Sequence, residues 1–407
     1  MQQIDLLPLL IITILVFVIP LLTSHIRWLV TPSIIGEIIG GIIIGKSGFN
    51  LIQSSPWLDF IYLFGFALFM FMMGLEIDLS QLLTTKWHRQ VKERFLFSPM
   101  VMAIIISLLT FAISFVVAHG LSRLGFTENI FLLSLILSTA SIGIVVPTIK
   151  QHMPEDTPLK QVILLTAIIS DVAVAILVTL VIATQEGGLI VRCIASIFAL
   201  FAAFFFVVRF GGRFISHGRV QTIISKLDRA TWHPHVRGAI VLMMLFVVLA
   251  QWLGIEFILG ALLAGIAISP EGASRLEGKL DALGYGFFVP IFFIMIGARF
   301  DLSTLVSSNQ TTLLILLLLV AVFLTKVLPS LVLRVRYSLR HSLSAGILLS
   351  SRLAFTIAVA AIALEFGAIS EAMNSAIILI AIISSVVAPL LFVRHSPKPL
   401  QIMTSQS

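Results

Sequence analysis

Charged residues are scarce in this sequence, and the shortage limits the kinds of protein it can be. Asp, Glu, Lys and Arg make up 11% of the 407 residues, while 59% are hydrophobic. A soluble domain carries about 25% charged residues, so this chain cannot cover itself with a water-facing surface. Its single cysteine, Cys193, excludes an internal disulfide and a cysteine-based metal site. Walker loops, dinucleotide fingerprints and HExxH or nucleophile-elbow motifs are missing too, so neither ATP-driven transport nor enzymatic catalysis has support.

Long apolar runs recur from residue 6 to residue 393. A helix of about 18 apolar residues or more crosses ~30 Å of hydrocarbon, and no stretch between the runs is long enough for a soluble domain. The sequence therefore predicts an all-α integral membrane protein with one membrane transport domain over 1–407. About thirteen transmembrane helices are expected, near residues 5–23, 32–46, 56–77, 95–119, 129–149, 160–184, 189–210, 236–253, 256–270, 282–299, 310–333, 342–365 and 372–393.

The basic residues predict how the chain is oriented in the membrane. With the N-terminus outside, most Lys and Arg fall in the inner loops, and the outer loops hold only Lys46, Arg123 and Arg299. Cytoplasmic loops carry such an excess, so we expect a multi-pass protein with its C-terminus in the cytoplasm. The same bias explains the pI of about 9.9 without a nucleic-acid partner.

Two pairs of segments indicate an internal repeat. Residues 74–82 resemble residues 297–305, and residues 34–45 resemble residues 258–269, at offsets that agree within one residue. The second predicted helix thus pairs with the ninth and the third with the tenth. This shift of seven helices is odd, so the second copy crosses the membrane in the opposite sense. We expect two inverted repeats of six helices joined by a linker helix at 189–210, an arrangement typical of secondary transporters.

Three ionisable residues lie well inside predicted spans. These are Asp171, Lys326 and Arg352. Each costs about 2.5–3.5 kcal/mol on membrane-insertion scales, so an incidental origin is disfavoured. One interpretation is a network that only ties helices together, and it stays open for Lys326 and Arg352. The other is an ion pathway, which we favour for Asp171, because a lone carboxylate among Ile, Val and Ala is a poor anchor.

A buried carboxylate offers a simple means of coupling two fluxes. Desolvation raises the proton affinity of such a group, so it holds either a proton or a metal cation. A hard cation also needs neutral oxygens, which Thr139 and Ser141 could supply. Ser350-Ser351-Arg352 occupy the matching place in the repeat. These polar clusters indicate either broken helices with freed carbonyls facing a cavity, or hydroxyls bonded to the preceding turn. Arg352 would offset the partial charges of carbonyls exposed at a break.

Other acids lie near helix ends. Glu37 follows Pro32 near one end of its predicted helix, and Glu76 and Asp78 close the next. We interpret all three as interfacial or loop-pairing groups rather than ion ligands. The neighbouring small residues, such as Gly36 and Gly41, are expected to allow close helix packing.

In combination, several segments resemble the monovalent cation:proton antiporters of the second family, the group with Kef-type and NapA-type proteins. The resemblance spans nearly the whole chain and rests on residues 32–45, 71–78 and 137–147, Ser170-Asp171, residues 292–297 and Lys326. It implies a homodimer whose protomers exchange Na⁺ or K⁺ for H⁺ by alternating access and need no cofactor. It further implies a bacterial inner-membrane location.

The resemblance also assigns roles to parts of the chain. Residues 1–79 and 236–309 would form the dimerisation part, and residues 95–184 and 310–394 the moving ion-translocating core. Two broken helices would cross in the core, beside Asp171. Asp171 matches the essential aspartate that binds Na⁺ or K⁺ and carries the proton. Kef-type proteins often continue into a cytoplasmic regulatory domain. Regulation by such a domain would need either a separate subunit or a longer chain than this one.

The sequence departs from the family pattern at two positions. Ser170 stands where the family often has Asp or Asn, so Lys326 lacks its expected partner and could pair with Asp171 directly. Ser170 then becomes a supporting ligand, and one titrating carboxylate favours electroneutral exchange. Ala354 replaces an acid that follows the family's arginine, which weakens the carry-over to Arg352.

Two other functions stay open on the residues alone. A cation channel or ligand-gated sensor could use the same scaffold. An organic-anion transporter could use Lys326 and Arg352 as substrate clamps, although Asp171 would repel its substrate. Neither the choice between Na⁺ and K⁺ nor the pH regulation and physiological direction follows from the sequence.

Overall fold

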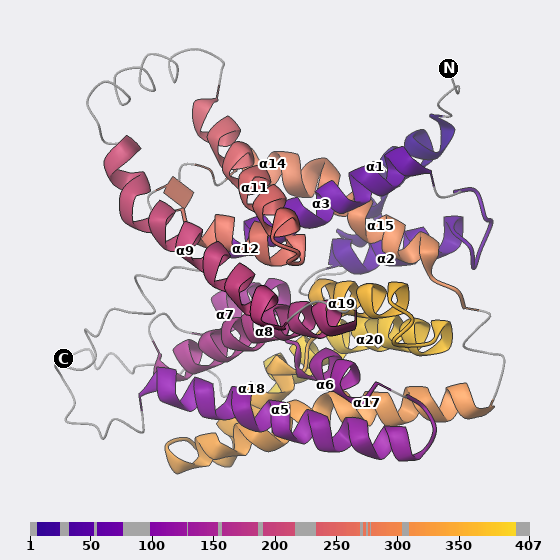
Figure 1. Cartoon of the computed structure of the whole chain (residues 1–407). Coiled ribbons are helices and arrows are strands. Elements are labelled where there is room, and N and C mark those ends of the chain that lie inside the picture. The colour runs from indigo at the N-terminus through magenta and orange to yellow at the C-terminus, as the bar shows by residue number, and fades with distance from the viewer. Residues whose placement is uncertain are drawn as a thin grey trace, which may run out of the picture. The chain divides into compact units, whose positions relative to one another are not determined.

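In this computed structural model, the chain is helical with no strand among the residues that the structure describes (Figure 1). Eight of the described helices are long and apolar enough to cross a membrane, and five shorter ones are apolar. The helices fall into the thirteen predicted segments, with ends that differ by a few residues, which confirms the all-α fold. The described residues are 6–24, 32–52, 55–75, 98–127, 129–153, 157–185, 190–215, 233–268, 272–273, 276, 278–302 and 309–395.

Proline sets where several helices begin. At the first helical position its missing N–H costs nothing, and its fixed φ already suits the helix. At one of these starts the side chain of Ser98 also accepts a hydrogen bond from the N–H of Val101, which satisfies one of the free N–H groups of the first turn. The helices that begin at proline are α2 (Pro32–Ile44), α3 (Pro56–Leu75), α5 (Pro99–Arg123), α8 (Pro158–Gln185) and α11 (Pro234–Trp252).

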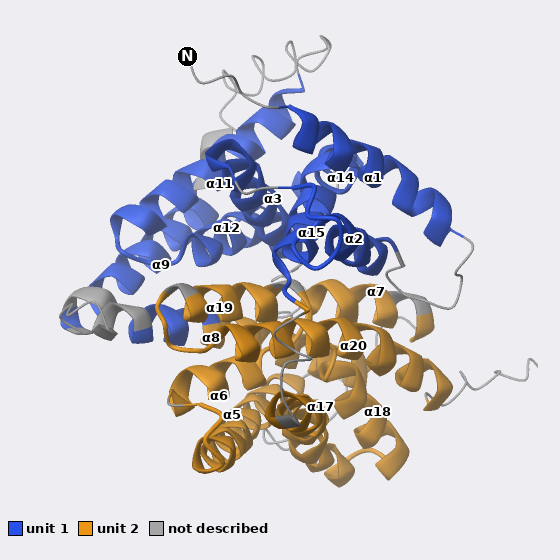
Figure 2. Cartoon of the chain, turned by 90° about the vertical axis from the view of Figure 1, so that its right-hand side faces the viewer, with its two compact units in different colours: residues 1–25, 32–85, 175–301 blue, residues 26–31, 86–174, 302–407 orange. Residues whose placement is uncertain are grey.

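The chain divides into two compact units (Figure 2). Unit 1 comprises residues 1–25, 32–85 and 175–301, and unit 2 comprises residues 26–31, 86–174 and 302–407. Besides α2, α3 and α11, unit 1 contains α1 (Leu7–Thr23), α9 (Ile190–Ile215), α12 (Phe257–Ile266), α14 (Lys279–Leu283), the π-helix η3 (Gly284–Phe288) and α15 (Val289–Arg299). The boundary falls within α8. The dimerisation and ion-translocating roles of the two predicted parts stay a prediction.

Unit 2 holds the two helices that the sequence predicts to be broken. The first is split into α6 (Ile130–Ser138) and α7 (Ile142–His152), and the second into α18 (Leu339–Leu349) and α19 (Ala354–Glu365). Both breaks are confirmed. The remaining helices of this unit, besides α5 and most of α8, are α17 (Asn309–Ser330), the 3₁₀ helix η4 (Leu331–Val335) and α20 (Glu371–His395).

Hydroxyl groups bond to the preceding turn at the same places. Ser138 donates to the carbonyl of Ser134, and Ser350 donates to the carbonyl of Gly346 at 2.8 Å. The helix breaks and the hydroxyls bonded to their own helix therefore occur together at these polar clusters. A π-helical turn at η3, which the sequence did not indicate, interrupts the segment predicted at 282–299.

Glycine contacts in unit 1 follow the predicted repeat. A Cβ added to Gly41 of α2 would lie 2.9 Å from the Cα of Gly297 in α15. The repeat relates these residues to Gly265 of α12 and Gly74 of α3, where an added Cβ would also lie 2.9 Å from the facing Cα. The two helix pairs thus pack through the same small residues, as closely packed membrane helices do. This reciprocal packing supports the repeat that the sequence predicts.

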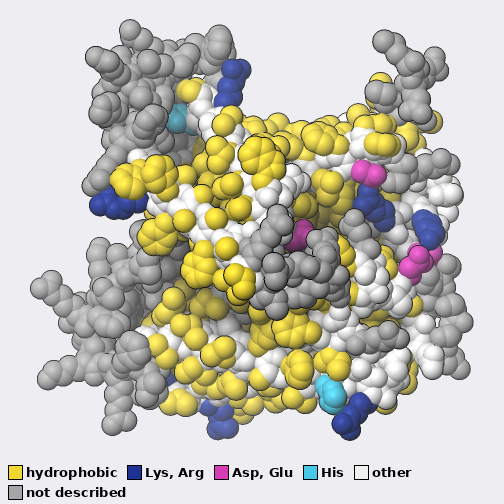
Figure 3. All heavy atoms as spheres, viewed as in Figure 1, with side chains coloured by type: hydrophobic (Ala, Val, Ile, Leu, Met, Phe, Trp, Pro, Cys, Tyr) yellow, Lys and Arg dark blue, Asp and Glu magenta, His cyan; other side chains and the backbone are white. Residues whose placement is uncertain are grey.

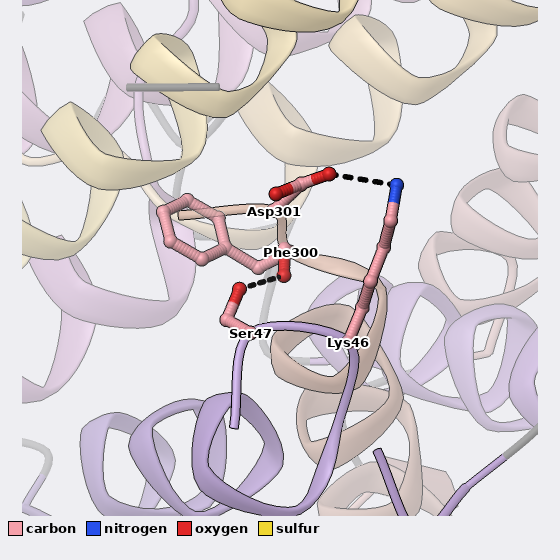
Figure 4. Close-up of polar contacts among 4 residues, drawn as sticks. All are labelled: Lys46, Ser47, Phe300 and Asp301. Atoms are coloured by element: carbon pink, nitrogen blue, oxygen red, sulfur yellow. Dashed lines mark hydrogen bonds and ion pairs between the residues drawn. The ribbon is translucent and has the colours of Figure 1, made fainter. Parts of the chain in front are cut away.

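The ends of α2 and α15 are tied together by polar contacts (Figure 4). The ammonium of Lys46 lies 2.7 Å from the Asp301 carboxylate, and the Ser47 hydroxyl donates to the carbonyl of Phe300 at 2.5 Å. The backbone N–H of Lys46 also donates to the carbonyl of Ala298. These bonds fix the register of the glycine contacts between the two helices.

Large apolar side chains cover much of the surface in view (Figure 3). Phe17 on α1 is 71% exposed and Phe198 on α9 is 72% exposed. Exposed apolar area of this extent is costly in water but not in hydrocarbon. The surface therefore agrees with a multi-pass protein in a lipid bilayer.

Candidate ion-binding site

The two helix breaks of unit 2 meet each other. The hydroxyl of Thr139, in the break after α6, lies 2.7 Å from the hydroxyl of Thr356, in the first turn of α19. Each break ends one helix and begins another, so it leaves carbonyls at a C-terminus and N–H groups at an N-terminus without helical partners. All three midspan charges contribute to satisfying these groups.

Asp171 lies in the middle of α8 and is 3% exposed. Its Oδ1 accepts a hydrogen bond of 2.8 Å from the backbone N–H of Ala140, and the carboxylate also interacts with the N–H of Ile142. These groups lie at the N-terminus of α7, where the helix dipole is positive and favours an anion. The carboxylate is thus held by backbone donors at a half-helix end.

Arg352 lies at a helix end of opposite polarity, the C-terminus of α6, where the helix dipole is negative. Its guanidinium donates to the carbonyls of Ile136, at 2.7 Å, and Leu137, at 2.5 Å. It also donates to the hydroxyls of Thr139 and Thr325, at 3.3 and 3.1 Å. The side chain is almost completely buried. Arg352 therefore places its positive charge at the negative end of the half-helix.

Lys326 donates a hydrogen bond to the last carbonyl of the same half-helix. Its Nζ donates to the carbonyl of Ser138 at 2.7 Å, and the side chain is fully buried. Within the described ranges, no ion pair of 4.0 Å or less joins Lys326 to Asp171. The charges of Lys326 and Arg352 still act on the carboxylate. The direct pairing that the sequence left open is therefore not the arrangement in this structure.

The break borders a cavity lined in part by Ile136, Leu137 and Thr356, and side chains bond to the freed carbonyls of α6. Arg352 and Lys326 donate hydrogen bonds to these carbonyls from positively charged groups. Two cations thus lie at the negative end of α6, and one carboxylate lies at the positive end of α7. Such an arrangement keeps three charges buried without a direct ion pair, because charge-assisted hydrogen bonds and helix dipoles compensate each of them.

The three predicted supporting ligands, Thr139, Ser170 and Ser141, have different hydrogen-bond partners from one another. The hydroxyl of Thr139 is engaged by Thr356 and Arg352, and it donates to the carbonyl of Ile136. The hydroxyl of Ser170 points to α5, where it donates to Ser107 at 3.4 Å. The side chain of Ser141 is buried and makes no hydrogen bond within the part of the chain that the structure describes. Ser141 is the hydroxyl that needs the least rearrangement to bind an ion.

Sequence reasoning missed two hydroxyls of the site, Thr325 and Thr356. Both are near a charge that it found, since Thr325 precedes Lys326 and Thr356 lies one turn after Arg352. A search for polar residues within one helical turn of each midspan charge would have selected them.

The interpretation of Glu37 as an interfacial or loop-pairing group is wrong. Its side chain is 3% exposed, because α2 packs closely between α1 and α15 of unit 1. Glu76 and Asp78, which were interpreted in the same way, lie outside the described residues.

Comparison with known proteins identifies the family. Residues 11–394 match the transmembrane region of the sodium/hydrogen exchangers. The chain belongs to this family. The prediction of a cation:proton antiporter, a secondary transporter and not an enzyme, is confirmed at the level of the family.

Individual relatives agree with this assignment. The Bacillus subtilis protein YjbQ, provisionally named a Na⁺/H⁺ antiporter, is 35% identical over 94% of this chain, which spans 62% of YjbQ. The Na⁺/H⁺ antiporter of Enterococcus hirae is 25% identical over 93% of this chain and 95% of its own length. Among solved structures, the sodium proton antiporter MjNhaP1 of Methanocaldococcus jannaschii aligns over 95% of this exchanger and 94% of MjNhaP1, with a TM-score of 0.61 and 14% identity. This last similarity supports the fold.

Proposed function

We propose that this exchanger moves Na⁺ or K⁺ against H⁺ by alternating access and that Asp171 binds both ions in turn. The observation that carries the proposal is the buried Asp171 carboxylate on the free N–H of Ala140, at the break between α6 and α7. In this environment the carboxyl group can release its proton when a cation binds, and it can release the cation when a proton binds. Competition for the one group couples the two fluxes in opposite directions.

The neighbouring groups support a distinct role for each residue. Ser141, Thr139 and Ser170 would supply neutral oxygens to the cation, with Ser141 the most accessible because its hydroxyl makes no bond to a described residue. Lys326 and Arg352 would stay on the carbonyls of α6 and hold the break in place. Their positive charge would also favour release of the bound cation.

The same contacts support electroneutral exchange, one cation for one proton. Ser170 cannot titrate in the ordinary pH range, so Asp171 is the one carboxylate of the site. The ammonium of Lys326 donates to the Ser138 carbonyl, and this hydrogen bond favours a lysine that stays protonated throughout the cycle. A transport current that scales with exchange would contradict this stoichiometry.

The relatives leave the cation open. The Bacillus cereus protein GerN, 26% identical to this chain, is named a Na⁺/H⁺-K⁺ antiporter. We propose membership of the second, Kef-type and NapA-type group, on the sequence motifs. We also propose a homodimer with an outer N-terminus and a core that slides in an elevator-like motion. A separate cytoplasmic regulatory subunit belongs to the same proposal.

The test is proton movement in liposomes. Purified protein is reconstituted with a pH-sensitive dye inside, a pH gradient is imposed, and Na⁺ or K⁺ is added to wild type, Asp171→Asn and Asp59→Asn. Asp59 is a suitable control, because its carboxylate is surface-exposed and paired with Arg299 in unit 1. We expect cation-dependent dissipation in wild type and in the control, and none in Asp171→Asn.

Two results would overturn the proposal. Dissipation that persists in Asp171→Asn would place the site elsewhere. Cation flux without proton countermovement would indicate a channel instead of an antiporter.

A further inference from the structure

Besides the three charges in unit 2, one further acidic side chain is buried among the described residues, and the proposed mechanism does not use it. Glu37 of α2 in unit 1 is 3% exposed. Each of the three charges in unit 2 has at least one strong hydrogen bond, whereas Glu37 has no hydrogen bond or ion pair to any residue that the structure describes.

The helices packed against α2 in unit 1 bring no charge to Glu37. These are α1 and α15. Helix α1 has no ionisable residue, and the only one of α15 is Arg299, in its last turn, where it binds Asp59 at 2.5 Å. The next cation along the chain, Lys46, lies beyond the end of α2 and binds Asp301 (Figure 4). No counter-charge for a carboxylate is therefore available from these elements.

The internal repeat indicates that packing does not require an acid here. The repeat relates Glu37 of α2 to Ala261 of α12, and both side chains are buried. Each is preceded by a glycine and followed, four residues later, by the glycine that meets the partner helix, Gly41 or Gly265. The same packing is thus achieved in α12 with a methyl group. The packing of α2 therefore does not account for a carboxyl at residue 37.

The surroundings limit which ligand the carboxyl can take. Burying an ionised carboxylate without a partner costs far more than burying the neutral acid, so the protonated form is the stable one. Na⁺ or K⁺ would need several oxygens to replace its water, whereas a proton needs only the carboxyl group itself. The ligand that fits a lone buried carboxyl is the proton.

We infer that Glu37 is a second proton-binding site, located in unit 1, which is protonated in this conformation and exchanges its proton with water. This inference goes beyond the site at Asp171 and does not depend on that assignment. It needs only the burial of Glu37, the lack of a counter-charge among the described residues packed against it, and the comparison with Ala261.

The experiment measures protonated carboxyl groups directly. Infrared spectra of the carbonyl stretch are recorded at neutral pH on purified protein in the Asp171→Asn background, which removes the other buried carboxyl of the described residues. The same background with Glu37→Gln is the comparison. We expect a protonated-carboxyl band that shifts after transfer to D₂O and is lost in Glu37→Gln.

Each outcome decides the inference. A spectrum that Glu37→Gln leaves unchanged would overturn the protonated site, and a band that does not shift in D₂O would overturn exchange with water. Glu37→Ala, which copies the repeat, guards against misfolding, and we expect it to keep the wild-type unfolding temperature and to lose the same band. Because no transport is measured, the result is independent of whether Asp171 binds the transported ion.

Discussion

Replacing Gly41 by alanine should weaken the packing of α2 on α15. The added Cβ would lie 2.0 Å from the carbonyl oxygen of Ile294 and 2.9 Å from the Cα of Gly297. Ordinary contacts of a Cβ begin at 3.4 Å. Both obstacles are backbone, which cannot rotate away as a flexible side chain can. The two helices must therefore move apart by about 1.4 Å, or α2 must shift along α15.

The size of the effect follows from two opposing terms. Overpacking of this kind costs about 1–3 kcal/mol, and a contact with backbone lies at the upper end of that range. Alanine gains about 0.5–1 kcal/mol over glycine inside a helix. We expect Gly41→Ala to lower the free energy of unfolding by about 2 kcal/mol. With an unfolding entropy of about 2.1 cal/mol/K per residue, this loss lowers the unfolding midpoint by about 2–3 °C for a chain of 407 residues.

Thermal unfolding in detergent measures this loss, with two matched variants. Gly265→Ala is the repeat counterpart, with its added Cβ 2.1 Å from the carbonyl oxygen of Phe71, and it should be destabilised to the same extent. Gly238→Ala of α11, where no heavy atom lies within 4 Å of an added Cβ, should be neutral or stabilising. If Gly41→Ala unfolds at the same temperature as Gly238→Ala, the close backbone approach is refuted.

Two further predictions concern single contacts. Thr356→Val removes the 2.7 Å hydrogen bond to Thr139 and should lower the free energy of unfolding by about 1 kcal/mol, whereas Thr356→Ser keeps the bond. Equal unfolding midpoints for the two variants would contradict the link between the breaks. Asp301→Asn weakens the contact with Lys46, which is 59% exposed, and should cost about 1 kcal/mol or less. This second difference should shrink in high salt, because exposed charges are screened, and a midpoint difference that grows with salt would exclude an ionic origin.

The two breaks illustrate how far sequence patterns reach. Ser138 to Ser141 and Ser350 to Arg352 indicate interruptions because polar residues at midspan are costly unless backbone or charge compensates them. The pattern could not say which charge meets which end. Arg352 and Lys326 lie far along the chain from Ile136 and Ser138, and only the packing of α17 and α19 on α6 brings them to these carbonyls.

Glu37 illustrates where such reasoning fails. Its position near Pro32 and the helix start indicates an interfacial side chain, since acids at helix ends are usually solvated. Burial depends instead on what packs around the helix, and the close approach of α1 and α15 leaves the Glu37 side chain only 3% exposed. Position along a helix predicts exposure only when the neighbours are known.

The sequence by itself determined the membrane location, the thirteen helical segments, the internal repeat and the identity of the three midspan charges. These follow from hydrophobic length and from the cost of buried charge, which are properties of local composition. Tertiary structure alone decided that Asp171 lies on the N–H of Ala140 and that Lys326 lies on the carbonyl of Ser138. Contacts between residues distant in sequence depend on how helices pack, and a pattern along the chain does not contain that information.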